Sequence, residues 1–243
     1  MNEKNSFETI FEGNIILKNS MLDKISYDEE KLEKTWNEFC KKKNDQLFND
    51  RVLTYIDSFQ QNDELVINAG FVDYKIVVSS RIEPDLGLNL QQIGVSGITI
   101  IHENDSEYVL FSSRSSKTTE YPNFLELVPS GNIDESALKN DGYIDYSSKL
   151  IGEFVEETGL NKSYIQKIEP KFLVFDKKNQ VYDVCCRILI SDSRNHIIEA
   201  FQNVSEYEKP ILIPLNSLSE FVSENFHKIV PTSLAILSNI MKK

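Results

Sequence analysis

The stretch Leu150-Ile151-Gly152-Glu153-Phe154-Val155-Glu156-Glu157-Thr158-Gly159-Leu160 decides how the whole chain is interpreted. On a helix, with about 100° between successive residues, Glu153, Glu156 and Glu157 share one face. We expect Ile151, Phe154 and Val155 to form the opposite, apolar face that docks on a core. Gly159 follows at a position where a helix can end in a left-handed residue. The stretch therefore predicts an amphipathic helix that carries three neighbouring carboxylates.

These carboxylates repel one another unless something neutralises them, at a cost of about 0.2–0.5 kcal/mol per like-charged pair. A hard divalent cation such as Mg²⁺ prefers oxygen ligands and would remove that cost. The alternative is a solvated acidic face without a ligand. A short motif alone leaves both interpretations open.

The composition is that of a globular protein. The chain has 243 residues, of which 40% are hydrophobic and 26% are charged, enough for one large domain or for a main domain with a smaller partner. A net charge of −12 argues against nucleic-acid binding and against docking on anionic membranes. The cysteines are Cys40, Cys185 and Cys186, an odd number without C-x-x-C spacing, so we expect neither a disulfide framework nor a zinc site.

The beginning of the sequence, Met-Asn-Glu-Lys-Asn-Ser, is polar and lacks the apolar core of a signal peptide. No apolar run approaches the roughly 20 residues that a membrane-spanning helix needs. We therefore expect a cytoplasmic protein whose partner is a small molecule and not a nucleic acid or a membrane. A homodimer is compatible with the sequence.

The first part of the chain predicts a small α/β unit. Residues 7–18 suit one or two strands, and residues 28–43 repeat apolar side chains at helical spacing. The period then changes to two, which predicts strands at 52–59, 64–68 and 71–78. A connection rich in Pro and Gly follows, so we place a boundary near residue 92. It divides an N-terminal subdomain, 1–92, from a second domain, 93–243.

The second part predicts strands on both sides of the opening helix. Before that helix, strands are expected at 95–102 and 108–112, then a short run at 124–128 that ends in Pro129-Ser130-Gly131. The helix itself should begin near Asp145, which can cap it. After it, we expect a hairpin of 172–175 and 181–190, strands at 197–201 and 211–215, and closing helices at 215–226 and 232–241. This order predicts an α/β sandwich with a mixed sheet.

Three landmarks make the second part resemble the Nudix hydrolase superfamily. That family's signature ends in Arg-Glu, an aliphatic residue, one residue, Glu-Glu, one residue, Gly and an aliphatic residue, and the segment Glu153 to Leu160 matches it at every position after the Arg. Residues 125–131 are similar to the strand and turn that lead to the signature glycine. Residues 206–215 are similar to the family's later acidic strand. The resemblance implies a Nudix-type α/β/α sandwich.

The sequence departs from the signature in its first half. Gly131 lies 21 positions before Gly152, where the family pattern has 14, so the loop carries about seven extra residues. Gly152 replaces the signature arginine, which normally pairs with a helix carboxylate and orients the loop. That brace is therefore absent or supplied by another group, for which Lys149 is a candidate. The first signature glutamate falls at Ile144, where Asp141 or Asp145 could substitute.

For a Nudix enzyme the implied reaction is hydrolysis of a diphosphate that is linked to another group. The resemblance implies Mg²⁺ (or Mn²⁺) held by Glu153, Glu156 and Glu157, with the Gly131 carbonyl as a further ligand. Glu156 and Glu157 are the first catalytic candidates. Glu206 or Glu208 is a candidate metal ligand or general base, and two exposed acids on an edge strand are the alternative.

Other residues are candidates for contacts with the substrate. Arg114 and Lys117 follow a strand and suit phosphate binding. Glu126 and Gly131 complete the expected substrate contacts, whereas Tyr121 and Phe124 either stack on a base or pack in the core.

The first part bears on the substrate. Its segment Trp36-Asn37-Glu38-Phe39, together with Leu47-Phe48-Asn49, resembles the N-terminal part of animal Nudix enzymes that split UDP-glucose and UDP-galactose. The resemblance implies a nucleotide sugar as substrate. The alternatives are a Nudix-fold module that binds a nucleotide without cleaving it, and a pyrophosphatase for ADP-ribose or another dinucleotide.

Overall fold

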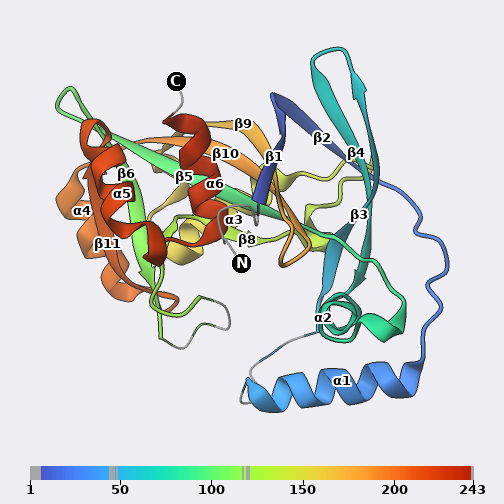
Figure 1. The fold of residues 1–243 in the computed structure, drawn as a ribbon. Coiled ribbons are helices and arrows are strands. Elements are labelled where there is room, and N and C mark those ends of the chain that lie inside the picture. The colour runs from blue at the N-terminus through green and yellow to red at the C-terminus, as the bar shows by residue number, and fades with distance from the viewer. Residues whose placement is uncertain (1–6, 44–46, 48, 117, 119–120, 242–243) are drawn as a thin grey trace.

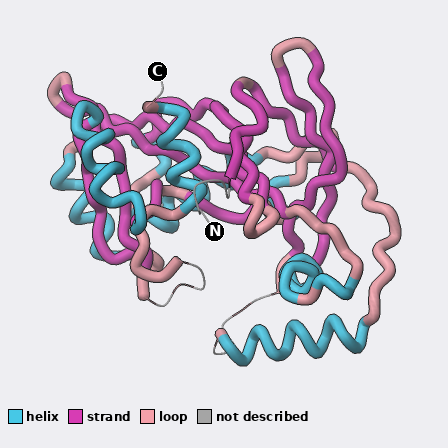
Figure 2. Tube along the Cα trace, in the orientation of Figure 1, coloured by secondary structure: helices cyan, strands magenta, loops and turns pink. Residues whose placement is uncertain are grey.

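A computed structural model describes residues 7–43, 47, 49–116, 118 and 121–241. Figures 1 and 2 show a long twisted sheet with helices on both of its faces and two further helices beyond one end. The predicted class, α/β with a mixed sheet, is confirmed.

The described residues form an 11-stranded sheet in which β1, β9, β10, β5, β3, β4 and β2 follow one another. Beside this row, β6 and β8 each pair with β5, and β7 and β11 each pair with β6. The strands are β1 (Phe7–Glu12), β2 (Asn14–Asn19), β3 (Arg51–Gln61), β4 (Glu64–Asp73), β5 (Gln92–Glu103), β6 (Ser106–Arg114), β7 (Leu125–Leu127), β8 (Ser130–Asn132), β9 (Ile165–Asp176), β10 (Val181–Ser191) and β11 (Tyr207–Pro214).

The centre of the sheet is the parallel pair β5 and β10, in which Gly94 lies opposite Asp183 and Val95 opposite Val184. Parallel strands covered on both faces are apolar nearly throughout, and β5 is buried from Gln92 to Ile101. The hairpin of β9 and β10 turns at residues 177–180, as the sequence predicts.

Helices cover both faces of this centre. On one face lie α3 (Tyr146–Thr158) and α4 (Arg194–Ala200), with Leu150 and Phe154 fully buried in the core cluster they share with the sheet. On the other face lie α5 (Leu218–Asn225) and α6 (Pro231–Ile240), which bury Leu218 and Leu237 in a second cluster. The two clusters make the molecule a three-layer sandwich.

The N-terminal part has a small core of its own, with α1 (Glu29–Lys42) and α2 (Tyr74–Ile82) around Leu32 and Val77. The strand predicted at 71–78 is correct only as far as Asp73, where β4 ends and α2 begins at once. The apolar run that suggested a strand is a helix buried on several sides. Its cap comes from far along the chain, since Asn49 Oδ1 accepts a hydrogen bond from the Lys75 amide at 2.8 Å. The local pattern could not show this cap.

The strand predicted at 197–201 is wrong. Residues 197–200 belong to α4, and Phe201 begins a short 3₁₀ helix. Helix α4 begins after Ser193, whose hydroxyl accepts a hydrogen bond from the amide of His196. A serine that can cap the amide three residues after it is a signal for the start of a helix. This signal should have outweighed the short apolar run.

The boundary near residue 92 stays a prediction. The sheet itself continues across it, because β3 pairs with β5 at Thr54 and Gln92, and because β1 pairs with β9. In the part of the chain that is described, no helix is long and apolar enough to cross a membrane.

Candidate active site

Helix α3 begins and ends where the sequence predicts. The Asp145 side chain accepts from the Ser148 amide at 2.9 Å, and Gly159 ends the helix with a φ of 72°. The predicted division into two faces is only partly correct. Phe154 is buried, but Val155 is 39% exposed, whereas Glu157 is 2% exposed. Residues 154, 157 and 158 share the core side because they are three and four positions apart.

Glu157 is the central carboxylate of the site. It accepts a hydrogen bond from the Ser130 amide at 3.0 Å, and the Tyr207 hydroxyl donates to it at 3.4 Å. Burial raises the pKa of Glu157 well above its usual value, and the charges of Glu126 and Glu206 raise it further. A buried carboxylate surrounded by other carboxylates is unstable as an anion unless a cation or a proton joins it.

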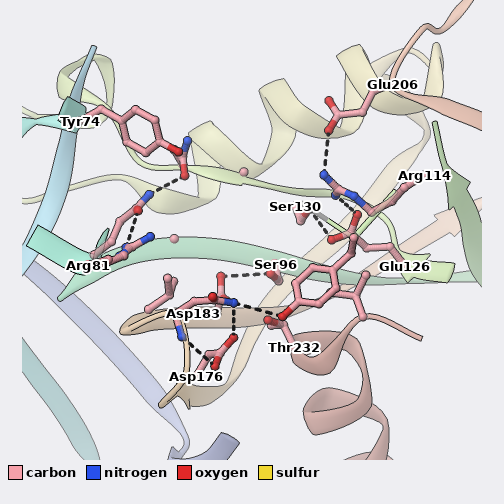
Figure 3. A pocket seen from close by; sticks show the side chains of 18 residues that line it. Tyr74, Arg81, Ser96, Arg114, Glu126, Ser130, Asp176, Asp183, Glu206 and Thr232 are labelled. Atoms are coloured by element: carbon pink, nitrogen blue, oxygen red, sulfur yellow. Dashed lines mark hydrogen bonds and ion pairs between the residues drawn. The ribbon is translucent and has the colours of Figure 1, made fainter. Parts of the chain in front are cut away.

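Arg114, at the end of β6, connects two further carboxylates. It forms an ion pair with Glu126, which is 7% exposed, and its Nη2 lies 3.7 Å from Glu206 Oε1 (Figure 3). Burial alone would lower the pKa of Arg114, but the charges of Glu126, Tyr207 and Glu206 raise it above its usual value. The Tyr207 hydroxyl donates to Glu126 at 2.8 Å. Arg114 is therefore held in place as a permanent cation beside α3.

Lys149 supplies a brace for the helix. Its Nζ lies 3.0 Å from Glu153 on the next turn of α3 and 2.9 Å from Asp134 in the preceding loop. It thus joins a helix carboxylate to the loop, which is the task that the Nudix resemblance assigns to the arginine replaced by Gly152. Burial raises the pKa of Glu153, and the Lys149 charge opposes that rise. Gly131 packs directly against Glu153, because a Cβ there would lie 2.6 Å from Glu153 Oε1.

The remaining predicted acids fall into two groups. Glu156 is exposed on α3, yet its charge is among those that raise the pKa values of Glu153 and Glu206. Glu208 is exposed, and Glu206 is the one that lines the cavity described below. Asp145 caps α3 and Asp141 accepts from the Tyr143 amide, so both are committed to local structure.

The fit of a metal ion can be tested on the donors themselves. Within the described ranges, no three His, Cys, Asp or Glu side chains are already arranged to hold a metal. However, the donors are hard carboxylate oxygens, and burial together with neighbouring negative charge raises the pKa values of Glu153, Glu157 and Glu206. Excess negative charge on oxygen donors is what Mg²⁺ or Mn²⁺ neutralises. The residues fit such an ion chemically.

A cavity of about 270 Å³ begins at Glu206 and Glu126 and extends along β5 and β10 toward α2. Figure 3 shows Glu206, Arg114 and Glu126 at one end, Tyr74 and Arg81 at the other, and Asp183 with Ser96, Asp176 and Thr232 between them. Its lining consists of Tyr74, Arg81, Gln92, Gly94, Ser96, Arg114, Tyr121, Glu126, Ser130, Gly131, Asn132, Asp176, Asn179, Val181, Asp183, Glu206, Val230 and Thr232.

Of the residues predicted for substrate binding, Arg114, Glu126 and Gly131 line this cavity, whereas Lys117 lies outside the described residues. Tyr121 lines it too, and its ring lies 5.5 Å from that of Phe124. No pattern in the sequence pointed to the residues that α2 contributes, Tyr74 and Arg81. Asp183 did carry a signal, since a charged residue inside the apolar strand β10 calls for an explanation.

No family model matches the chain, and no curated protein matches it. Solved structures do match. The NUDIX domain of Shewanella oneidensis NrtR complexed with ADP ribose is 14% identical, with a TM-score of 0.43 over 64% of this chain and 90% of that one. A NUDIX hydrolase from Alicyclobacillus acidocaldarius is 12% identical, with a TM-score of 0.42 over 61% of this chain and 90% of that one. A C. elegans Ap4A hydrolase is 10% identical, with a TM-score of 0.39 over 60% and 90%. Likenesses this distant carry no information about this chain's substrate.

Proposed function

We propose that the chain is a Nudix-type hydrolase that cleaves the diphosphate of a nucleoside diphosphate linked to another group. The observation that supports this most strongly is that Arg114 pairs with Glu126 and Glu206. The Tyr207 hydroxyl, in turn, connects Glu126 to Glu157 on α3. A protein gains no stability from gathering buried like charges, so the arrangement favours a site that binds a cation and an anionic substrate.

Mg²⁺ or Mn²⁺ is the expected cofactor, with Glu153, Glu156 and Glu157 as its protein ligands. When bound, the ion would supply neutralisation of phosphate oxygens and lower the pKa of an attacking water. Lys149 and Gly131 fix the position of Glu153, and Ser130 with Tyr207 fixes that of Glu157. The carboxylates are thus oriented before substrate arrives, which is the main demand of phosphoryl chemistry.

The other residues act on the substrate. The oxygen of water attacks one phosphorus, the bond from that phosphorus to the bridging oxygen breaks, and each product leaves with a phosphate. Glu206 is the proposed general base for the water's proton, because it lines the cavity and partial desolvation there raises its pKa. Arg114 donates hydrogen bonds to the phosphate oxygens as charge shifts during the reaction. Glu126 keeps the guanidinium aimed at that position.

A nucleotide sugar such as UDP-glucose is the proposed substrate, with the monophosphate and the sugar phosphate as products. ADP-ribose or another dinucleotide is the second candidate, since a site that recognises a diphosphate need not distinguish them. A nucleotide-binding module without hydrolysis is the third. It is favoured by the lack, among the described side chains, of a ready-made metal cluster. The brace through Lys149 favours the enzyme, because a pure binder has no need of an oriented Glu153.

The test is release of nucleoside monophosphate from a panel of UDP-glucose, UDP-galactose, GDP-mannose and ADP-ribose, with Mg²⁺ and with Mn²⁺. We expect metal-dependent release of UMP from UDP-glucose. Nucleotide binding without turnover of any member of the panel would contradict the hydrolase and leave the binding module.

We place this activity in the cytoplasm. Cys185 and Cys186 are buried in the core, and neither forms a disulfide. Unpaired cysteines are typical of a reducing compartment.

A further inference from the structure

The middle of the cavity, between Arg114 and helix α2, has no task in the proposed hydrolysis. Its floor consists of Asp183 on β10, Ser96 on β5 and Thr232 at the start of α6, and its side of Asp176 and Asn179 in the β9–β10 hairpin. We call these five residues the Asp183 chamber. Asp183 is 9% exposed, and the mechanism above does not use it. A charged residue type so deep in a strand requires either a partner or a function.

Every polar group of the chamber is oriented by the fold. Ser96 Oγ donates to Asp183 Oδ1 at 3.1 Å, and the Thr232 side chain also hydrogen-bonds Asp183. Asn179 Nδ2 donates to Asp176 at 2.9 Å and to the Tyr121 hydroxyl at 3.2 Å. The Cβ of any residue larger than glycine at position 94 would lie 2.9 Å from Asp183 Oδ1, so Gly94 leaves the carboxyl its place.

The wall toward the N-terminal part is linked to the same strands. Arg81 Nη2 donates to Gln92 Oε1 at 2.8 Å, and Gln92 Nε2 donates to Asn132 Oδ1 at 2.6 Å. Helix α2 is itself held against α1 by an edge-to-face contact between Tyr74 and Trp36, with ring centroids 6.2 Å apart. The cavity is therefore closed at this end by the N-terminal part.

The chemistry of the chamber differs from that of a site for an anion or a base. A second phosphate would face Asp176 and Asp183. A nucleobase needs flat apolar surfaces above and below its ring, but none of the five residues of the chamber is aromatic. Of the two rings among the described residues that line the cavity, Tyr74 lies at the α2 end, and Tyr121 is joined to the chamber through its hydroxyl, which accepts from Asn179. Oriented carboxyl, amide and hydroxyl groups that converge from several strands suit a ligand that is uncharged and carries hydroxyls around its whole outline. That ligand class is a sugar.

We propose that the Asp183 chamber is the sugar subsite of this protein, in which Asp183 and Thr232 hydrogen-bond hydroxyl groups of the ligand. This rests on the proposed function, because the diphosphate must lie near Arg114 for the sugar to reach the chamber. Burial raises the pKa of Asp183 to about 7, with Ser96 opposing and Asp176 adding to that rise. A carboxyl that retains its proton can donate a hydrogen bond as well as accept one.

The experiment measures equilibrium binding by calorimetry, in EDTA, so that no turnover occurs. The ligands are UDP-glucose, UDP-galactose, GDP-mannose and ADP-ribose, each against its own nucleoside diphosphate, and UDP-glucose analogues that each lack one hydroxyl. The variants are Asp183→Ala, Thr232→Val and the conservative Asp183→Asn. The matched control is Asp105→Asn in the exposed β5–β6 turn.

For at least one pair we expect the nucleotide sugar to bind more tightly than its diphosphate. Asp183→Ala should weaken binding of the sugar nucleotide about 10- to 100-fold and binding of the diphosphate less than 2-fold. This is the loss expected when one oriented hydrogen bond is removed. Thr232→Val should give a smaller loss of the same selectivity, and Asp183→Asn should retain most of it. One deoxy analogue should bind the wild type about tenfold more weakly and be indistinguishable from UDP-glucose in Asp183→Ala.

Three results would overturn the proposal: no sugar preference in the wild type for any pair, equal weakening of diphosphate and sugar nucleotide by Asp183→Ala, or no effect of that substitution on either. Equal weakening would instead place the nucleoside in the chamber. Sugar-dependent binding without hydrolysis in the presence of metal would contradict the proposed function and leave the sugar subsite standing.

Discussion

Two regions of the cavity, the end near α3 and the Asp183 chamber, both contain buried carboxylates, but the negative charge is neutralised differently in each. Near α3, Glu157 lies among Glu126 and Glu206 with one cation, Arg114, between them, so negative charge is in excess. In the Asp183 chamber, Asp183 hydrogen-bonds the hydroxyl groups of Ser96 and Thr232, and no cation is among the causes that set its pKa. A metal ion would neutralise the excess negative charge near α3, whereas Asp183 becomes neutral by keeping its proton.

This difference teaches how one residue type can serve two purposes in a single cleft. Carboxylates that face one another repel, and a divalent ion that binds between them removes this repulsion. A buried carboxyl that has hydroxyl partners and no cation beside it gains more from keeping its proton than from ionising. The predictions below change one region while leaving the other intact.

The largest effect should come from removing charge at the α3 end. Glu156→Gln together with Glu157→Gln should lower kcat/KM on the order of 10³-fold or more, because the groups that orient the metal are lost. Steady-state release of UMP with Mg²⁺ measures this. The control is Glu220→Gln together with Glu224→Gln on α5, which removes the same charge from an exposed helix and should retain activity. Equal loss in both double variants would show that net charge and not the site is responsible.

Lys149→Met should weaken activity about 10- to 100-fold, as is usual when a partner that orients a metal ligand is removed. Adding Gly152→Arg should restore part of it, since a Cβ at position 152 would meet no atom within 4 Å and the backbone there leaves room for a side chain to begin. Lys139→Met is the matched control, because Lys139 forms an exposed ion pair with Asp145 at 3.0 Å. If Gly152→Arg fails to restore any activity, Lys149 does more than replace the signature arginine.

The proton in the Asp183 chamber predicts a pH dependence of stability. An unfolded aspartate has a pKa of about 3.9, and the folded one is raised to about 7. Its contribution to stability is therefore fully present below the unfolded pKa and is lost as pH rises through the folded pKa. Between these values it makes the unfolding free energy fall by about 1.4 kcal/mol per pH unit.

Asp183→Asn should remove that contribution, and urea unfolding at several pH values between 4.5 and 7 measures it. The other charged groups that face Asp183, namely Asp176 and Glu126, are present in both proteins and cancel in the difference. Asp105→Asn again serves as the control. Parallel pH profiles for the wild type and Asp183→Asn would mean that Asp183 is ionised throughout.

The smallest effect concerns the two glycines of the opening segment. Gly152→Ala should raise the unfolding free energy by about 0.5–1 kcal/mol, because alanine restricts the unfolded chain and nothing obstructs its methyl group. Gly159→Ala should lower it by more than about 1 kcal/mol, since φ is 72° and the new Cβ would lie 2.6 Å from the Ala200 carbonyl. Chemical denaturation compares the two. Opposite signs are the expected outcome, and a destabilising Gly152→Ala would contradict the open space at that position.

Local patterns predicted those parts of the fold that local interactions determine. Short-range rules are enough to predict the cap and the terminal glycine of α3, the strands on either side of this helix and the β9–β10 hairpin. Helix α2 did not, because its cap, Asn49, lies outside the segment. The same limit applies to the site. The acids of α3 were visible as a motif, whereas Tyr207 and Asp183 became interpretable only when distant strands were brought together.

The pairing of β5 with β10 has a consequence for how the protein folds. Gly94 and Asp183 are neighbours across this pair although almost 90 residues separate them, and β1 joins β9 over a still longer stretch. Closing such long loops costs entropy before any contact repays it, so parallel pairings of this kind form slowly. On the ribosome, neither region of the cavity can be complete until β10 has emerged. The ligand-binding surface therefore forms late in folding. Ligand binding can be used to detect when the strands most distant in the sequence have paired.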